Sequence, residues 1–144
     1  MEEWRKEMNE SMESSKIEIG IIACASNASN TGSLTSRVAL ELAKMLGEKV
    51  GICSLPAIAT NVPRQTNLVK SIPILVVIDG CHNECAKKIL DNVKINPSIY
   101  INLEYDLDFK KEGPFSTFNY KGDHVKSIVG YVLSKIKKGD EINE

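Results

Sequence analysis

The four cysteines are the residues whose type and spacing most directly suggest chemistry. They are Cys24, Cys53, Cys81 and Cys85. The first two end short apolar segments with the composition of β-strands, and the third comes shortly after another such segment. The fourth lies four residues further along, a spacing that places two side chains on one face of a helix. If the strands are parallel, all four thiols lie at one edge of the sheet, where open α/β sheets carry their sites.

Coordination of a metal ion is the simplest use of four converging thiolates. Zinc takes four cysteine ligands in a tetrahedron, and its closest ligand pair commonly has two to four residues between its members. Cys81 and Cys85 have three residues between them. An iron–sulfur cluster could use the same ligands, but the cysteine runs of ferredoxins are absent, which favours zinc. A single free cysteine is more often a small buried apolar residue, so the prediction rests on all four together.

Two further interpretations stay open. Cys85, in the first turn of an expected helix, and Cys24, in the approach to another, both lie near the positive end of a helix dipole, which favours thiolate. This suits a thiol-based redox or sulfur-transfer enzyme as well as a metal site. The segment from Ser26 to Thr35 resembles a loop that holds a phosphate or a flavin phosphate at a helix N-terminus, as in flavodoxin-like proteins. A polar turn with a helix cap explains the same residues more simply.

Strand and helix patterns alternate along the chain, and they must position these residues. Strands are expected over residues 16–24, 50–53, 74–78 and 98–103. Longer helices are expected from Leu34 to Leu46, over residues 82–93 and from Val125 to Ile136, where apolar residues recur at helical spacing. Residues 63–70 suit a short helix. This alternation predicts a three-layer α/β/α fold, flavodoxin- or Rossmann-like, with four parallel strands in the order 2-1-3-4.

Length and composition limit the remaining possibilities. The 144 residues predict one domain over residues 16–139, with flexible tails at 1–15 and 140–144. A net charge of −1 argues against a nucleic-acid partner. No apolar run is long enough to span a bilayer, and the acidic N-terminus does not look like a secretory signal. A reducing cytoplasmic location is therefore expected, in which cysteines serve as thiols or metal ligands rather than disulfides.

Residues 78–87, with the sequence IDGCHNECAK, resemble the DGC-domain family, named for its Asp-Gly-Cys motif. The resemblance extends from about Ile19 to Ile136. It implies an α/β domain that binds zinc, and its ligands would be Cys24, Cys53, Cys81 and Cys85. Asp79 and Gly80 belong to the motif without an assigned role. His82 stands where members of the family often have proline, and it could serve as a ligand or a hydrogen-bond donor to a thiolate.

Overall fold

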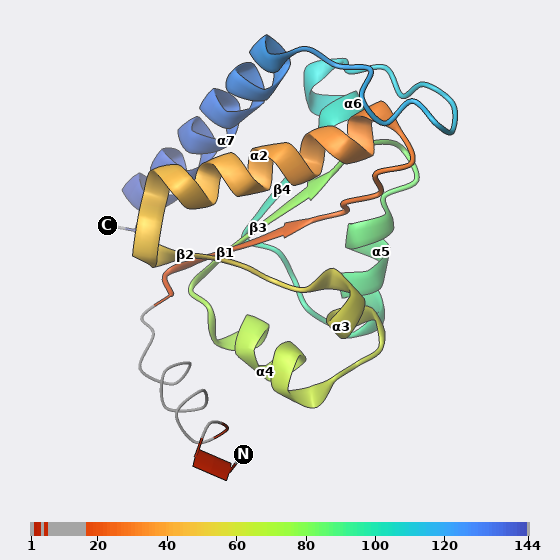
Figure 1. Ribbon diagram of the computed structural model, residues 1–144. Helices are drawn as coiled ribbons and strands as arrows, with labels where there is room; N and C mark the ends of the chain where they lie inside the picture. Colours follow the sequence, from red (N-terminus) through yellow and green to blue (C-terminus); the bar gives the residue numbers. More distant parts are fainter. Residues whose placement is uncertain (1, 4, 6–16, 144) are drawn as a thin grey trace.

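Four parallel strands form one sheet in the order β2-β1-β3-β4 in the computed structural model, which describes residues 2, 3, 5 and 17–143. The strands are β1 (Ile19–Ala23), β2 (Val50–Ile52), β3 (Ile74–Asp79) and β4 (Ile99–Asn102). The helices are α2 (Asn30–Leu46), the 3-10 turn η1 (Gly47–Lys49), α3 (Leu55–Ala59), α4 (Pro63–Ser71), α5 (Cys85–Asn92), α6 (Leu103–Leu107) and α7 (Gly122–Asn143). Helices lie on both faces of the sheet (Figure 1). The predicted three-layer fold and strand order are confirmed.

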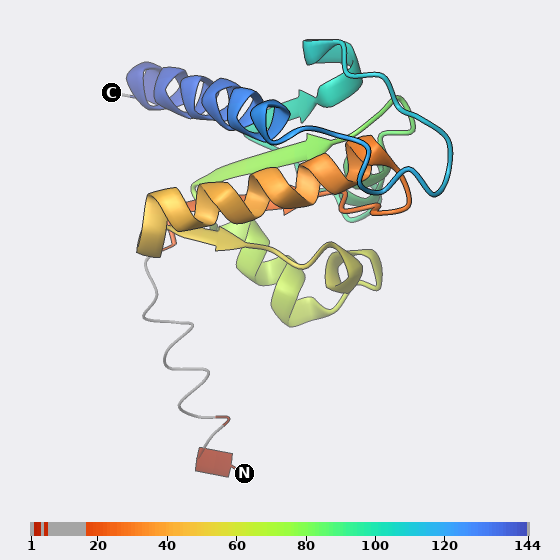
Figure 2. The same cartoon turned by 45° about the horizontal axis from the view of Figure 1, so that its top comes forward.

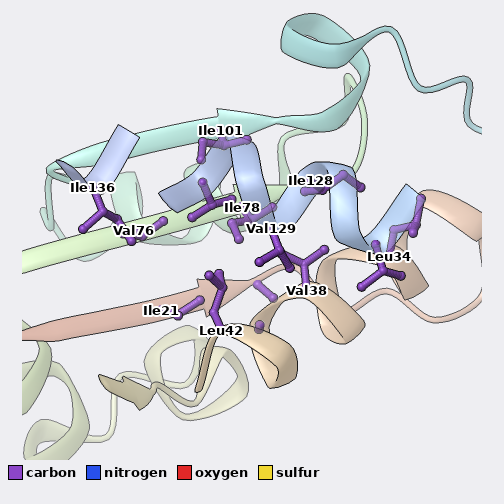
Figure 3. Packing of buried hydrophobic residues seen from close by; sticks show 14 of the residues in the cluster. Ile21, Leu34, Val38, Leu42, Val76, Ile78, Ile101, Ile128, Val129 and Ile136 are labelled. Atoms are coloured by element: carbon purple, nitrogen blue, oxygen red, sulfur yellow. The ribbon is translucent and has the colours of Figure 1, made fainter. Parts of the chain in front are cut away.

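One face of the sheet is covered by α2 and α7, which run beside each other across it (Figure 2). Apolar residues from both helices meet those of the central strands (Figure 3). Val38 and Leu42 of α2, Ile128 of α7, and Val76 and Ile78 of β3 are among those that are completely enclosed. Burial of each such side chain contributes about 1.5–3 kcal/mol to stability.

The opposite face is covered by the shorter helices α3, α4 and α5 (Figure 1). Ile58 of α3, Val69 of α4 and Leu90 of α5 pack there against Ile22 and Val77 of the sheet. Because β1 and β3 are covered on both sides, they are continuously apolar rather than alternating. This smaller layer includes the helix that begins at Cys85.

Several element boundaries differ from those expected. Helix α2 begins at Asn30, before its first apolar residue, because the Ser29 side chain caps it by accepting from the Gly32 N–H at 3.3 Å. Helix α5 begins at Cys85 instead of residue 82, because Glu84 has a left-handed backbone (φ 51°) and ends a turn in which its N–H donates to Cys81 O. The short helices α3 and α6 were not expected.

The structure describes only part of the two predicted tails. Most of the segment 1–15 lies outside the described residues. At the other end, α7 continues to Asn143, through most of the segment predicted as a tail. None of the helices in the described ranges has both the length and the apolar character that crossing a bilayer requires.

Candidate metal centre

The parallel register brings the cysteine-bearing segments to the carboxyl edge of the sheet. Cys24 follows β1, and its N–H donates to Ile78 O of the neighbouring strand at 3.0 Å. The Cys53 N–H donates to Ile21 O at 2.9 Å, so this residue continues the pairing of β2 with β1. Cys81 lies in the β3–α5 connection, two residues after β3, and Cys85 is the first residue of α5.

Three of the four cysteines line one small cavity. Cys24, Cys81 and Cys85 lie around a space of about 30 Å³, close to the volume of one water molecule in the liquid. Cys24, Cys53 and Cys81 are partly buried and Cys85 is exposed, and all four are free thiols. The structure therefore brings together two sequence-distant segments at the predicted edge.

Cys53 lies on the far side of Cys24 from this cavity. It lines a larger, mainly apolar cavity of about 480 Å³, and Cys24 is the cysteine that borders both spaces. Both residues pack against the apolar cluster beneath α3 and α5. The Cys53 Sγ lies back along the sheet, 3.2 Å from the position that a Cβ on Gly20 would take. Cys53 thus shares a face with Cys24 but not the small cavity.

Asp79 holds the start of α5 in place. Asp79 is 1% exposed. Its carboxylate accepts hydrogen bonds from the N–H of Ala86 at 2.9 Å, the N–H of Lys87 at 3.1 Å and the Tyr100 hydroxyl at 2.9 Å. A carboxylate at a helix N-terminus satisfies N–H groups that have no partner within the helix. Asp79 therefore positions Cys85, which begins that helix.

Gly80 allows two backbones to approach closely. A Cβ at this position would lie 2.8 Å from the carbonyl carbon of Thr31 and 2.9 Å from its oxygen. Only glycine fits without a shift of the backbone. The β3–α5 connection therefore packs directly on the first turn of α2, and Cys81 enters the cavity from that connection.

Cys24 is held by a buried hydroxyl. The Thr35 Oγ1 accepts from the Ala25 N–H at 3.0 Å and donates its proton to Gly32 O at 2.6 Å. The Cys24 Sγ lies 3.5 Å from the Thr35 Oγ1. Since the Thr35 proton is already engaged, the Cys24 thiol is the donor in this contact.

The pKa of the Cys85 thiol does not follow the helix-dipole prediction. Burial first, and then the nearby Asp79, Cys24 and Cys81, raise the pKa of the Cys85 thiol, while Lys88 opposes the shift. Burial raises the pKa of Cys53 to about 11, in spite of a backbone hydrogen bond with Ile21. The expectation of a low thiol pKa at Cys85 is wrong, because desolvation and neighbouring negative groups outweigh the helix dipole.

A second donor group shares Cys81. Ligand atoms of Cys81, His82 and Glu104 all lie within 4.8 Å of one another, and within residues 17–143 no other trio of this kind is found. The Glu104 carboxylate accepts from the His82 backbone N–H at 2.8 Å and lies 2.9 Å from its Nδ1. These hydrogen bonds lower the pKa of Glu104, the His82 side chain having the largest effect. Sequence reasoning missed Glu104, although its place just after β4 was a usable signal.

The loop between α6 and α7 borders the cavity as well. Lys111 of this loop is among the residues that line the cavity, and the loop lies beside the β1–α2 connection (Figure 2). Asn30 joins the two, donating to Lys110 O at 3.0 Å and accepting from the Glu112 N–H at 2.9 Å. The segment from Ser26 to Thr35 is therefore held by the α6–α7 loop as well as by the helix cap at Ser29.

One comparison with known proteins gives a match. The model of the DGC domain matches residues 20–132. That range includes the four cysteines and the Asp-Gly-Cys motif that positions two of them. Neither the curated proteins nor the solved structures yielded a match. Because the family model covers well over half of the chain, the protein belongs to the DGC-domain family.

Proposed function

We propose that this protein binds one zinc ion through Cys24, Cys53, Cys81 and Cys85. The observation that carries the proposal is that Cys24, Cys81 and Cys85, from two separate segments, line one small cavity, although their sulfurs do not all lie within 4.8 Å of one another. Sulfur ligands suit zinc, which has no geometric preference of its own and accepts a tetrahedron of thiolates. Cys53 is the fourth sulfur on the same face, beyond Cys24.

The electrostatics of the cavity support a cation. Asp79, Cys24 and Cys81 each disfavour a negative charge on Cys85. A divalent cation between the sulfurs would compensate this repulsion, and the thiols would release their protons on binding. With zinc bound, Asp79 would hold the start of α5 and so keep Cys85 at the cavity.

A zinc ion with four thiolate ligands has no open position, so the proposed role is structural, sensing or metal handling. The enzymatic alternative, redox or sulfur transfer at one cysteine, requires a reactive thiolate. The raised pKa values of Cys53 and Cys85 leave both as thiols near neutral pH. A zinc ion would displace these protons on binding, whereas nucleophilic attack needs the thiolate before any metal is bound.

Metal analysis of the protein as isolated tests the proposal. We expect about one equivalent of zinc, and an X-ray absorption spectrum dominated by sulfur ligands. Single serine variants of Cys24, Cys81 and Cys85 should each lose most of the metal, and Cys53→Ser should lower the sulfur count to three. Circular dichroism on each variant separates loss of metal from loss of fold.

Two control variants address the competing donor group. His82→Ala and Glu104→Gln remove ligands of the Cys81, His82 and Glu104 trio and leave every sulfur in place. Zinc content should stay unchanged in both. Less than about half an equivalent in the wild type, unaffected by a Cys81→Ser/Cys85→Ser double substitution, contradicts the proposal.

A further inference from the structure

The trio of Cys81, His82 and Glu104 is already assembled in the fold. Its ligand atoms all lie within 4.8 Å of one another, and the His82 Nδ1 lies 2.9 Å from the Glu104 carboxylate. Zinc bonds of about 2.0–2.3 Å in a tetrahedron separate the ligand atoms by about 3.3–3.8 Å. Small side-chain rotations therefore suffice for this trio to accept the ion, whereas the cysteine sulfurs around the small cavity do not form so compact a group.

Asn102 holds the two halves of the trio together. Its side chain donates to Cys81 O at 2.9 Å and accepts from the Glu104 N–H at 3.0 Å, and the residue is 1% exposed. The Glu104 carboxylate in turn accepts from the His82 N–H at 2.8 Å. Because these hydrogen bonds set the backbone positions of all three residues, binding an ion there orders little that is not already ordered.

The trio is open to solvent, and one of its members also belongs to the cysteine group. The His82 side chain is 56% exposed and that of Glu104 is 32% exposed. Cys81 lines the small cavity together with Cys24 and Cys85. Three protein ligands leave the fourth position of a zinc ion open to water or to a group of a donor molecule, whereas four thiolates leave none. The trio therefore suits arrival and departure of the ion, and the cysteines suit its retention.

We propose that Cys81, His82 and Glu104 form the entry site for zinc, from which the ion moves to the cysteine site while it stays bound to the Cys81 sulfur. The inference rests on the proposed zinc site. As the Cys81 sulfur binds the ion, its thiol proton goes to solvent. The sulfurs of the other cysteines then replace the His82 nitrogen and the Glu104 oxygen, and each of these thiols also releases its proton to solvent. No electron is transferred in either step.

Zinc transfer from the protein as isolated to an excess of a chromophoric chelator tests the route, because exit must retrace the steps of entry. His82→Ala and Glu104→Gln should each slow this transfer about tenfold, as expected for loss of one group that holds the metal. Their zinc content before the transfer should equal that of the wild type. A substitution that only loosens the structure would release zinc faster, so slower transfer is specific to a lost route.

Two matched variants complete the kinetic test. Asp91→Asn removes an exposed carboxylate from the last turn of α5, away from the trio, and should leave the transfer rate unchanged. Glu104→Asp keeps a carboxylate at the trio and should restore part of the rate that Glu104→Gln loses. Equal or faster transfer in both His82→Ala and Glu104→Gln overturns the proposal.

Direct binding to the trio is measured in a Cys24→Ser/Cys53→Ser/Cys85→Ser variant, which keeps Cys81, with cobalt(II) as the probe in place of zinc. We expect one cobalt ion with a sulfur-to-cobalt charge-transfer band, and about tenfold weaker binding when His82→Ala is added. Absence of cobalt binding by the folded variant, shown by circular dichroism, overturns the proposal. Low zinc content in the wild type removes the four-cysteine site, whereas this cobalt titration reports on the trio alone, so the two failures are distinguishable.

Discussion

Each residue of the Asp-Gly-Cys motif has a separate physical task. Asp79 satisfies the first N–H groups of α5, Gly80 lets the backbone pack on α2, and Cys81 lines the cavity between them. The motif therefore joins two helix N-termini at one place. Its glycine is required by the close packing, since Gly80 is not among the residues with positive φ.

Substitution of Gly80 tests this packing. Gly80→Ala places a methyl group about 2.8 Å from the backbone of Thr31, which cannot move as a flexible side chain can. We expect the free energy of unfolding in urea to fall by about 1–3 kcal/mol. The control is Gly130→Ala, within α7, where an added Cβ meets nothing within 4 Å and should raise stability by about 0.5–1 kcal/mol. Equal effects of the two substitutions would contradict the packing argument.

The pair of His82 and Glu104 predicts a dependence of stability on pH. His82 lowers the pKa of Glu104 below its ordinary value, so the ionised carboxylate is more favourable in the folded protein. Its stabilisation is present above the unfolded pKa of about 4.3 and is lost as the pH falls through the lower folded pKa. The pair is solvent-exposed, so the effect is small and is screened by salt.

Urea denaturation at pH values from 3 to 6 measures this contribution. Glu104→Gln should reduce the loss of stability on acidification relative to the wild type. The control Glu48→Gln changes an exposed carboxylate far from His82 and should leave the pH profile nearly unchanged. A profile of Glu104→Gln that matches the wild type would show that the hydrogen bonds to His82 contribute nothing to folding.

At the scale of elements, the site depends on what holds the N-terminus of α2. The β1–α2 connection and the α6–α7 loop are joined by several hydrogen bonds, including Phe115 N–H to Ala28 O at 2.8 Å and Thr117 Oγ1 to Asn27 O at 2.6 Å. Asn30 supplies both a donor and an acceptor to the same loop. Two segments about 80 residues apart thus form one wall of the cavity.

Asn30→Ala should release that loop. Asn30 is 7% exposed, and its loss leaves the Glu112 N–H and the Lys110 carbonyl without their partner. We expect a loss of about 1–3 kcal/mol and faster hydrogen exchange over residues 110–117. Asn67→Ala, at an exposed position of α4, is the neutral control. Unchanged exchange over 110–117 would mean that other contacts hold the loop.

At the scale of the whole molecule, the proposed zinc ion would connect segments that follow three different strands. A ligand that binds only the folded state stabilises it by about 4 kcal/mol at a thousand times its Kd. For a chain of this size, chelation should therefore lower the Tm by roughly 10 °C. Differential scanning calorimetry with and without chelator measures the shift, and the Cys81→Ser/Cys85→Ser variant should show none.

Zinc affinity should rise with pH between 6 and 8. Cys53 and Cys85 both have raised pKa values, so each is protonated in this range and must release its proton to bind the metal. The affinity gains about tenfold per pH unit for each proton released. Competition with a chromophoric chelator at several pH values measures this slope. A slope of zero would contradict ligation by these two thiols.

The order of elements along the chain determined the architecture. Continuously apolar strands that alternate with amphipathic helices have one common solution, a parallel sheet covered on both faces, and the strand order followed from it. The edge of the sheet at which the cysteines lie could also be predicted, because parallel strands all end on the same side. These cysteines are Cys24, Cys53, Cys81 and Cys85. These conclusions depend on periodicity, which is a local property.

The tertiary structure alone decided which groups meet within that edge. No local pattern shows that Gly80 touches the backbone of Thr31, that Cys53 lies beyond Cys24, or that Glu104 reaches His82. The helix dipole predicted a low pKa for Cys85, but desolvation and neighbouring charges reversed it. Burial and Coulomb interactions depend on distances between segments remote in sequence, so only the folded chain determines them.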